Sequence, residues 1–91
     1  MAFPETWLNE LMNRNDIVSV VSEYTRLSPK GGRLWGLCPF HPERDASLTV
    51  SPDKQVFHCF SCKAGGSVIQ FIMQAESLGY ADAVRFLAQR A

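Results

Sequence analysis

The chain lacks the features that would place it in a membrane or a secretory pathway. No apolar run among its 91 residues approaches the roughly 20 residues that a transmembrane helix requires. Residues 1–5 contain neither a basic stretch nor the start of an apolar core, so we expect no signal peptide. These absences predict a soluble protein of the cytoplasm with no membrane contact.

Signatures of catalysis are also missing. The acidic residues are scattered, so no element carries the paired carboxylates that would hold Mg²⁺. The pairs Gly31-Gly32 and Gly65-Gly66 lack the flanking residues of a phosphate-binding loop, and we interpret them as a turn and a helix entry. We therefore expect the chain alone to be no enzyme.

Cysteine is scarce, and its odd count of 3 does not suit a disulfide framework. All three cysteines lie in two short turns, Cys38-x-x-His41 and Cys59-x-x-Cys62. The 17 residues between His41 and Cys59 leave room for one hairpin. Each turn aims two ligands at one point, and three thiolates with one imidazole are typical of structural zinc. The sequence therefore predicts one structural zinc ion bound by Cys38, His41, Cys59 and Cys62.

Two alternatives concern the same site. His58 adjoins Cys59 and rivals His41 as a ligand, although its offset breaks the pairing of the two turns. His41-x-Glu43 followed by the second turn also resembles the pattern of zinc deaminases, which place a proline before their Cys-x-x-Cys and leave one zinc position open for water. His58 stands where that proline would be, and Cys38 would fill the open position, so we expect a structural ion.

The spacing of apolar residues predicts helices at both ends of the chain, over about residues 4–24 and 67–90. Pro4 suits a first helical turn, Asp16 can cap a second helix, and Ser67 can cap a third. The residues expected to face inward from these helices are Trp7, Leu8, Leu11, Ile17, Val20, Val21, Tyr24, Val68, Phe71, Ile72, Ala83, Val84 and Leu87.

Between the helices, over about residues 25–63, the period changes to that of strands. We expect one hairpin of residues 25–28 and 33–37 around a turn at 29–32, and a second of residues 47–51 and 55–59 around a turn at 51–54. Leu48 and Val50 are expected in the core, and Gly65 and Gly66 are expected to end the strand region. The pattern predicts one α+β domain over residues 1–91.

The net charge of zero hides a gradient along the chain. Residues 1–23 contain four acidic residues and one basic residue, whereas residues 24–66 contain six basic and three acidic residues. In that middle region basic residues alternate with aromatic ones, as they do in proteins that bind single-stranded nucleic acid. Strand alternation places Arg33 and Trp35 on one face, and turns Phe57 away from Val56 and His58. The alternative for Trp35, Phe40, Phe57 and Phe60 is that they cover the zinc and pack under the helices.

Three stretches, residues 14–18, 35–41 and 57–66, carry a family resemblance. The last two contain Cys-Pro-Phe-His and Phe-His-Cys-Phe-x-Cys-x-x-Gly-Gly in that order. Together the three stretches closely resemble the N-terminal zinc-binding domain of bacterial DNA primases of the DnaG type, over essentially the whole chain. The resemblance implies a zinc-ribbon fold, a small antiparallel sheet with flanking helices, and the same four zinc ligands.

The resemblance also implies a function in DNA replication. It implies that the domain engages a single-stranded DNA template, helps to select the start site of RNA primers, and has the primase polymerase core and a replicative helicase as partners. The implied nucleic-acid contacts are Lys30, Arg33, Trp35, Lys54, Phe57, His58 and Lys63.

The chain departs from the family pattern in two places. After the first ligand pair the family typically has Glu-Lys-Thr-Pro-Ser, whereas this chain has Glu43, then Arg44, Asp45, Ala46 and Ser47. It also stops at Ala91, where a primase would continue into its polymerase core, so the carboxylates that join nucleotides are not in it. The alternative function is a stand-alone zinc-ribbon module, of a phage or mobile element, that docks on a polymerase or helicase.

Overall fold

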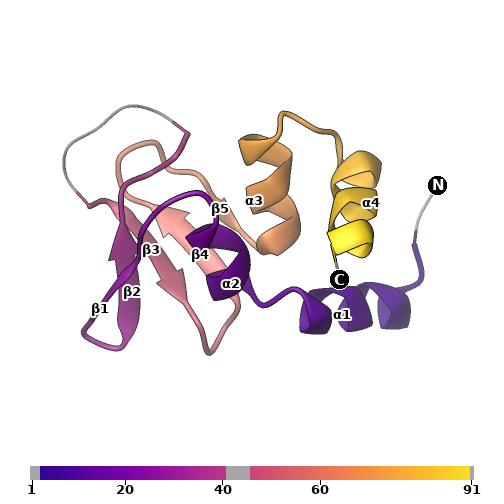
Figure 1. Ribbon diagram of the computed structural model, residues 1–91, viewed down its shortest axis with the longest axis horizontal. Coiled ribbons are helices and arrows are strands. Elements are labelled where there is room, and N and C mark those ends of the chain that lie inside the picture. The colour runs from indigo at the N-terminus through magenta and orange to yellow at the C-terminus, as the bar shows by residue number, and fades with distance from the viewer. Residues whose placement is uncertain (1–2, 41–45, 91) are drawn as a thin grey trace.

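The computed structural model describes residues 3–40 and 46–90. Within these ranges an antiparallel sheet of five strands lies at one end of the molecule, and the four helices lie to one side of it (Figure 1). The helices are α1 (Glu5–Arg14), α2 (Ile17–Ser22), α3 (Val68–Ala75) and α4 (Tyr80–Arg90). The strands are β1 (Ser28–Lys30), β2 (Arg33–Gly36), β3 (Leu48–Ser51), β4 (Val56–Cys59) and β5 (Gly65–Gly66), and they adjoin one another in chain order. The predicted α+β class, a small sheet with flanking helices, is confirmed.

The two N-terminal helices meet at a cap that the sequence predicted. The Asp16 carboxylate accepts a hydrogen bond from the Ser19 backbone N–H at 3.2 Å, and α2 then buries Ile17 completely. Trp7 of α1 was predicted to face inward, but it is 42% exposed. The prediction was wrong because Trp7 stacks on Phe3 at one end of the molecule, with 5.4 Å between the ring centroids.

The sheet differs from the prediction at both of its edges. Pro29, expected in a turn, is the middle residue of β1, where an edge strand tolerates the missing N–H. The turn is Gly31-Gly32 alone, and both glycines have a positive φ, 60° and 78°, which suits a two-residue hairpin. Gly65 and Gly66 end the strand region, as expected, but they are themselves a strand, β5, which pairs with β4 as the other edge of the sheet.

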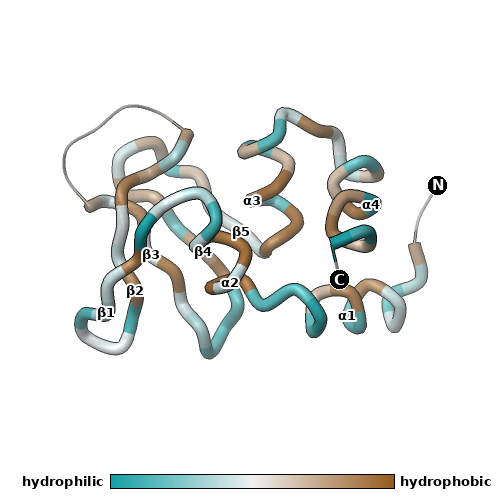
Figure 2. Tube along the Cα trace, in the orientation of Figure 1, coloured by the Kyte–Doolittle hydropathy of each residue, from teal (hydrophilic) through white to brown (hydrophobic). Residues whose placement is uncertain are grey.

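The core lies between one face of the sheet and the helices. Helix α3 packs against β4 and β5 and also against α2 and α4, and hydrophobic segments of these helices turn toward one another (Figure 2). The Phe71 ring of α3 lies 5.3 Å from the Phe57 ring of β4. The predicted core residues Leu48, Val50, Val68, Phe71, Ile72, Ala83, Val84 and Leu87 are all buried.

Helix α3 begins at the residue that the sequence indicated. The Ser67 hydroxyl accepts a hydrogen bond from the Ile69 backbone N–H, and the Gln70 side chain accepts one from the Ser67 N–H at 2.9 Å. This capping box fixes the point at which the chain leaves the sheet. None of the helices in the described ranges combines the length and apolar character needed to cross a bilayer.

Gly36 lies close to the backbone of a neighbouring segment, and its substitution is a test of the fold. A Cβ atom at Gly36 would lie 2.6 Å from the Arg26 carbonyl oxygen, so the two segments would have to move apart. We expect Gly36→Ala to lower the free energy of unfolding by about 2 kcal/mol in urea denaturation.

The matched control for this test is Gly79→Ala. A Cβ atom at Gly79 meets nothing within 4 Å among the described residues, so we expect a change of less than about 0.5 kcal/mol. Equal losses in the two variants would contradict the close approach at Gly36.

Candidate metal centre and nucleic-acid interface

Three cysteine sulfurs converge at one end of the sheet. The Sγ atoms of Cys38, Cys59 and Cys62 all lie within 4.8 Å of one another, and those of Cys38 and Cys62 are 3.8 Å apart. A tetrahedral zinc ion about 2.3 Å from each sulfur separates its ligands by about 3.8 Å, whereas a disulfide bond is about 2.0 Å long. The cluster therefore has the dimensions of a metal site.

The backbone after β4 folds Cys62 back toward Cys59. The Lys63 N–H donates to the Cys59 carbonyl at 2.9 Å, and the Cys59 N–H donates to the Ala64 carbonyl at 2.8 Å. Lys63 has a φ of 65°, a left-handed conformation that is uncommon outside glycine. This turn and the start of β5 together hold two of the three sulfurs in place.

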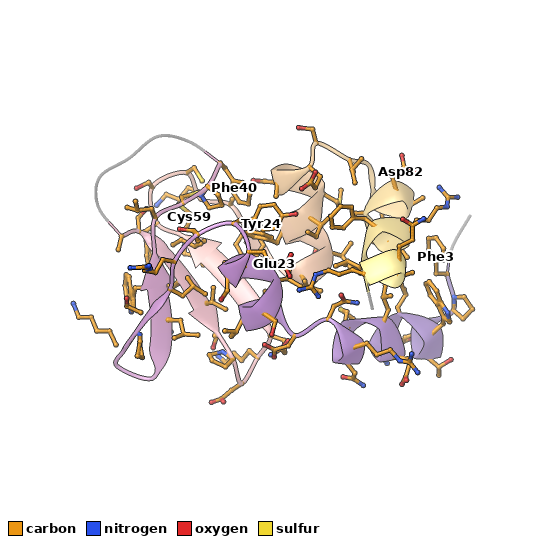
Figure 3. The ribbon with its side chains drawn as sticks, in the orientation of Figure 1. Phe3, Glu23, Tyr24, Phe40, Cys59 and Asp82 are labelled. Carbon is orange, nitrogen blue, oxygen red and sulfur yellow. The ribbon has the colours of Figure 1, made fainter. Side chains whose placement is uncertain are left out.

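The surroundings of the sulfurs suit a divalent cation. Burial is the main reason that the pKa of the Cys38 thiol is raised to about 12; a hydrogen bond with the Phe40 backbone opposes the shift, and the neighbouring Cys59 and Cys62 add to it. Cysteine binds metals as the thiolate, and a bound Zn²⁺ supplies the positive charge that stabilises clustered thiolates. Phe40 and Cys59 lie at the same end of the sheet (Figure 3).

The sequence offers two histidines, His41 and His58, as the fourth zinc ligand. His41 lies outside the described residues, so its role stays a prediction. His58 alternates with Cys59 along β4 and therefore projects from the opposite face of the sheet. There its ring packs against the Phe60 ring, with 4.8 Å between the ring centroids. Within the described ranges the cluster that could hold a metal consists of the three cysteines. This placement does not favour His58 as a ligand.

An array of aromatic rings lies on the sheet face opposite the core. Trp35, Thr49 and His58 are direct partners across β2, β3 and β4, so they project to the same side. Phe60 follows β4 and stacks on Trp35, with 5.9 Å between the ring centroids. With these large side chains as its neighbours, Thr49 is only 4% exposed, whereas Phe60 is 47% exposed.

Basic side chains surround these rings. The Lys30 Nζ lies 6.0 Å from the centre of the Trp35 ring, and the Trp35 Nε1–H donates to the Lys30 carbonyl at 3.2 Å. Arg33 and Lys54 line a shallow depression of about 280 Å³ beside the rings. We refer to this surface as the outer sheet face. Its residues are Lys30, Arg33, Trp35, Lys54, His58 and Phe60.

Two residues of the implied nucleic-acid set lie elsewhere. Phe57 is 2% exposed and contacts Phe40 and Phe71 in the core, so the structure corrects its assignment as a surface contact. Alternation along β4 turns Phe57 inward, to the side opposite His58. Lys63 is exposed in the turn that follows Cys62, and no contact between described residues joins it to the outer sheet face.

Phe60 is the functional candidate that was missing from the predicted contact set. It lies just beyond the last residue of β4, in the turn between Cys59 and Cys62. Strand alternation stops at that point, so the sequence pattern does not give the direction of its side chain. The one signal available was its position between two zinc-ligand cysteines in an otherwise basic and aromatic segment.

Comparisons with known proteins agree with this site. Residues 3–91 match the family of CHC2 zinc fingers. The DNA primases of Staphylococcus epidermidis and Staphylococcus aureus are each 43% identical to this chain over 90 residues. These matches include 99% of this chain but 15% of each primase, so the chain spans a small part of the length of these relatives.

A solved structure gives the same result. The crystal structure of the zinc-binding and RNA polymerase domains of Aquifex aeolicus primase is similar to this chain with a TM-score of 0.83 and 44% sequence identity. The similarity covers 90% of this chain and 20% of that one, so the chain corresponds to a small part of that structure. The family and the three-cysteine cluster together fit a single structural zinc ion. The chain belongs to the CHC2 zinc-finger family, the zinc-binding domain of DnaG-type DNA primases.

Proposed function

We propose that this domain engages the single-stranded template of a DNA primase and helps to select the site at which RNA primer synthesis begins. The outer sheet face is the observation that carries the proposal. Lys30, Arg33 and Lys54 would contact phosphates, while Trp35 and Phe60 would stack on bases, which is how sequence-tolerant single-strand binding is built. His58 lies among the rings, where it would add a further contact to a base.

The zinc ion would act as a staple and not as a reagent. We propose Cys38, His41, Cys59 and Cys62 as its four ligands, so that no position is left open for water. Cys59 is the last residue of β4, and Cys38 follows two residues after the end of β2. Because these strands carry His58 and Trp35, the ion would fix the ends of the strands that present the rings.

The partners follow from the same proposal. The domain would work beside the polymerase core of a primase and a replicative helicase in the cytoplasm, and it would not catalyse nucleotide addition itself. Lys63, which is exposed in the zinc turn, would contact a phosphate at the margin of the template path. Linkage to a polymerase core would raise the effective concentration of a domain whose own affinity is low.

The test is a titration of labelled single-stranded oligonucleotides at several salt concentrations. We expect Trp35→Ala to weaken binding roughly tenfold, the cost of losing about one stacked base. Arg33→Ala should reduce the slope of log affinity against log salt by about one phosphate contact. Each variant should keep its zinc, as measured by metal analysis.

Matched controls lie on the helices. Trp7 is 42% exposed on α1, and Arg85 is exposed on α4, where it pairs with Asp82 at 3.0 Å. Trp7→Ala and Arg85→Ala should bind oligonucleotides as the unaltered chain does. Absence of binding at low salt, or binding with no salt dependence, would rule out the template proposal.

A second candidate function is docking on a polymerase or helicase by a protein-interaction zinc ribbon. The observation that favours it is the aromatic group of Phe3, Trp7 and Tyr80, in which Trp7 and Tyr80 are 42% and 40% exposed. Phe3 lies at the end of the molecule opposite Cys59 (Figure 3). This function would be favoured if the unaltered chain does not bind oligonucleotides but binds a polymerase or helicase, and if Trp7→Ala abolishes that protein binding.

A further inference from the structure

A second depression adjoins the outer sheet face. It has a volume of about 800 Å³ and lies between α1 and the turn that joins β3 to β4. Lys54 and Val56 line both this depression and the shallow one beside the aromatic rings. The two depressions therefore adjoin at the side chains of these two residues. We call the second one the α1 groove, and its main lining residues are Asn9, Met12, Asn13, Lys54 and Val56.

The turn that forms one wall of the α1 groove is held in place by Gln55. The Gln55 side chain accepts a hydrogen bond from the Ile17 N–H at 2.9 Å and donates to the Asp16 carboxylate and the Pro52 carbonyl at 2.8 and 2.9 Å. Gln55 also has a φ of 56°, a conformation that persists where surrounding contacts enforce it. These hydrogen bonds hold the turn that contains Lys54 against the start of α2, which directly follows α1.

The same hydrogen bonds reduce the obstacle that Asp16 would present to an anionic ligand. Its carboxylate accepts from the Gln55 amide and from the Ser19 backbone N–H, so its charge is engaged at the N-terminus of α2. Glu10, on α1, pairs with Arg14 at 3.1 Å. Lys54 is then the basic group at the entrance to the groove from the sheet.

The chemistry of the α1 groove suits a nucleic-acid base. Met12 is half-buried and Val56 is 36% exposed, so both offer apolar surface for the flat face of a base. Asn9 and Asn13 are exposed four residues apart on α1, hence on one side of the helix. No hydrogen bond between described residues engages their amide groups. A carboxamide offers both a donor and an acceptor, the combination that pairs with base edges in single strands.

We propose that a single strand bound on the outer sheet face continues past Lys54 into the α1 groove. One of its bases lies against Met12 and Val56 and forms hydrogen bonds with Asn9 and Asn13. The inference rests on the proposed template function and extends the strand from the sheet onto the first helix. The occupant is a nucleotide of the same strand, because the two depressions adjoin and share the Lys54 cation at their junction.

The experiment compares two oligonucleotide lengths on the zinc-loaded chain. Fluorescein-labelled strands of about 4 and about 10 nucleotides are titrated and followed by anisotropy. The unaltered chain is expected to bind the longer strand roughly tenfold more tightly. The double variant Asn9→Ala/Asn13→Ala should lose most of that gain and keep its affinity for the shorter strand.

The matched control removes two amides from other helices. Gln74 on α3 and Gln89 on α4 are exposed, and Gln74→Ala/Gln89→Ala should bind both strands as the unaltered chain does. Side-chain amide signals in ¹⁵N-labelled protein give a measurement that needs no variant. Those of Asn9 and Asn13 should shift with the longer strand and remain in place with the shorter one.

The outcomes separate the groove from the sheet face. If the double variant retains the full gain with length while Trp35→Ala weakens binding, the groove inference is overturned and the template proposal stands. Equal losses on both strands would also overturn it, because the groove would then not be an extension reached only by longer strands. If the unaltered chain binds neither strand, the template proposal fails and the groove inference fails with it.

Discussion

Removal of the zinc ion is expected to unfold at least the sheet of this domain. A structural zinc ion contributes on the order of 10 kcal/mol of apparent folding free energy at pH 7, which rivals the entire stability of a domain of this size. Cys38 and Cys59 are buried and lie at or near the ends of two different strands, β2 and β4. Without the ion, no metal bond would link the ends of these strands. Circular dichroism and thermal melting before and after complete chelation measure the effect.

A substitution separates loss of the ion from side effects of the chelator. Cys62→Ser should release the zinc and lower the melting temperature sharply, because an alcohol is a poor zinc ligand. Ser61→Ala alters the neighbouring exposed residue of the same turn and should keep both the zinc and the melting temperature. The staple hypothesis is wrong if complete zinc removal leaves the spectrum and the melting curve unchanged.

Replacement of Asn15 is expected to cause the second-largest loss. Its side chain is fully buried between α1 and α4 and donates to the carbonyls of Leu11 and Leu87 at 2.9 and 3.2 Å. Its Oδ1 accepts from the Arg90 guanidinium at 3.1 Å, and Arg90 also pairs with Glu23. Asn15→Leu would leave a buried carbonyl of α4 without its donor, so we expect the free energy of unfolding to fall by about 3 kcal/mol.

The control for Asn15 is the same change two residues earlier. Asn13 is exposed on α1, so Asn13→Leu should change the free energy of unfolding by less than about 0.5 kcal/mol. Urea denaturation of the zinc-loaded variants measures both values. Similar losses for the two substitutions would show that the buried hydrogen bonds of Asn15 do not link the first and last helices.

Several elements could be predicted because their causes are local. The caps at Asp16 and Ser67 are confirmed, since a cap depends on residues within one turn of the helix start. Helix α4 ends where the predicted helical region ends, and Ala83, Val84 and Leu87 are buried as expected. The short spacings of the cysteines likewise placed their sulfurs within reach of one ion.

The failed predictions involve partners distant in the sequence. Gly65 and Gly66 carry no strand signal, and they form β5 because β4 offers them an open edge. Pro29 belongs to β1 because β1 has a neighbour on one side only among the described strands. Trp7 follows the helical spacing of its neighbours, yet α1 lies at the end of the molecule and leaves this side chain outside the core.

The sequence by itself determined the family, the α+β class, the helix caps and the pairing of short cysteine turns, because each depends on neighbouring residues. Tertiary structure decided which aromatic rings meet solvent. Helix α3 covers the face that carries Phe57, so Trp35 and Phe60 are left on the outer sheet face. The α1 groove has the same origin: Asn9 and Lys54 are distant along the chain, and only the packing of the β3–β4 turn against the helices brings them to one surface.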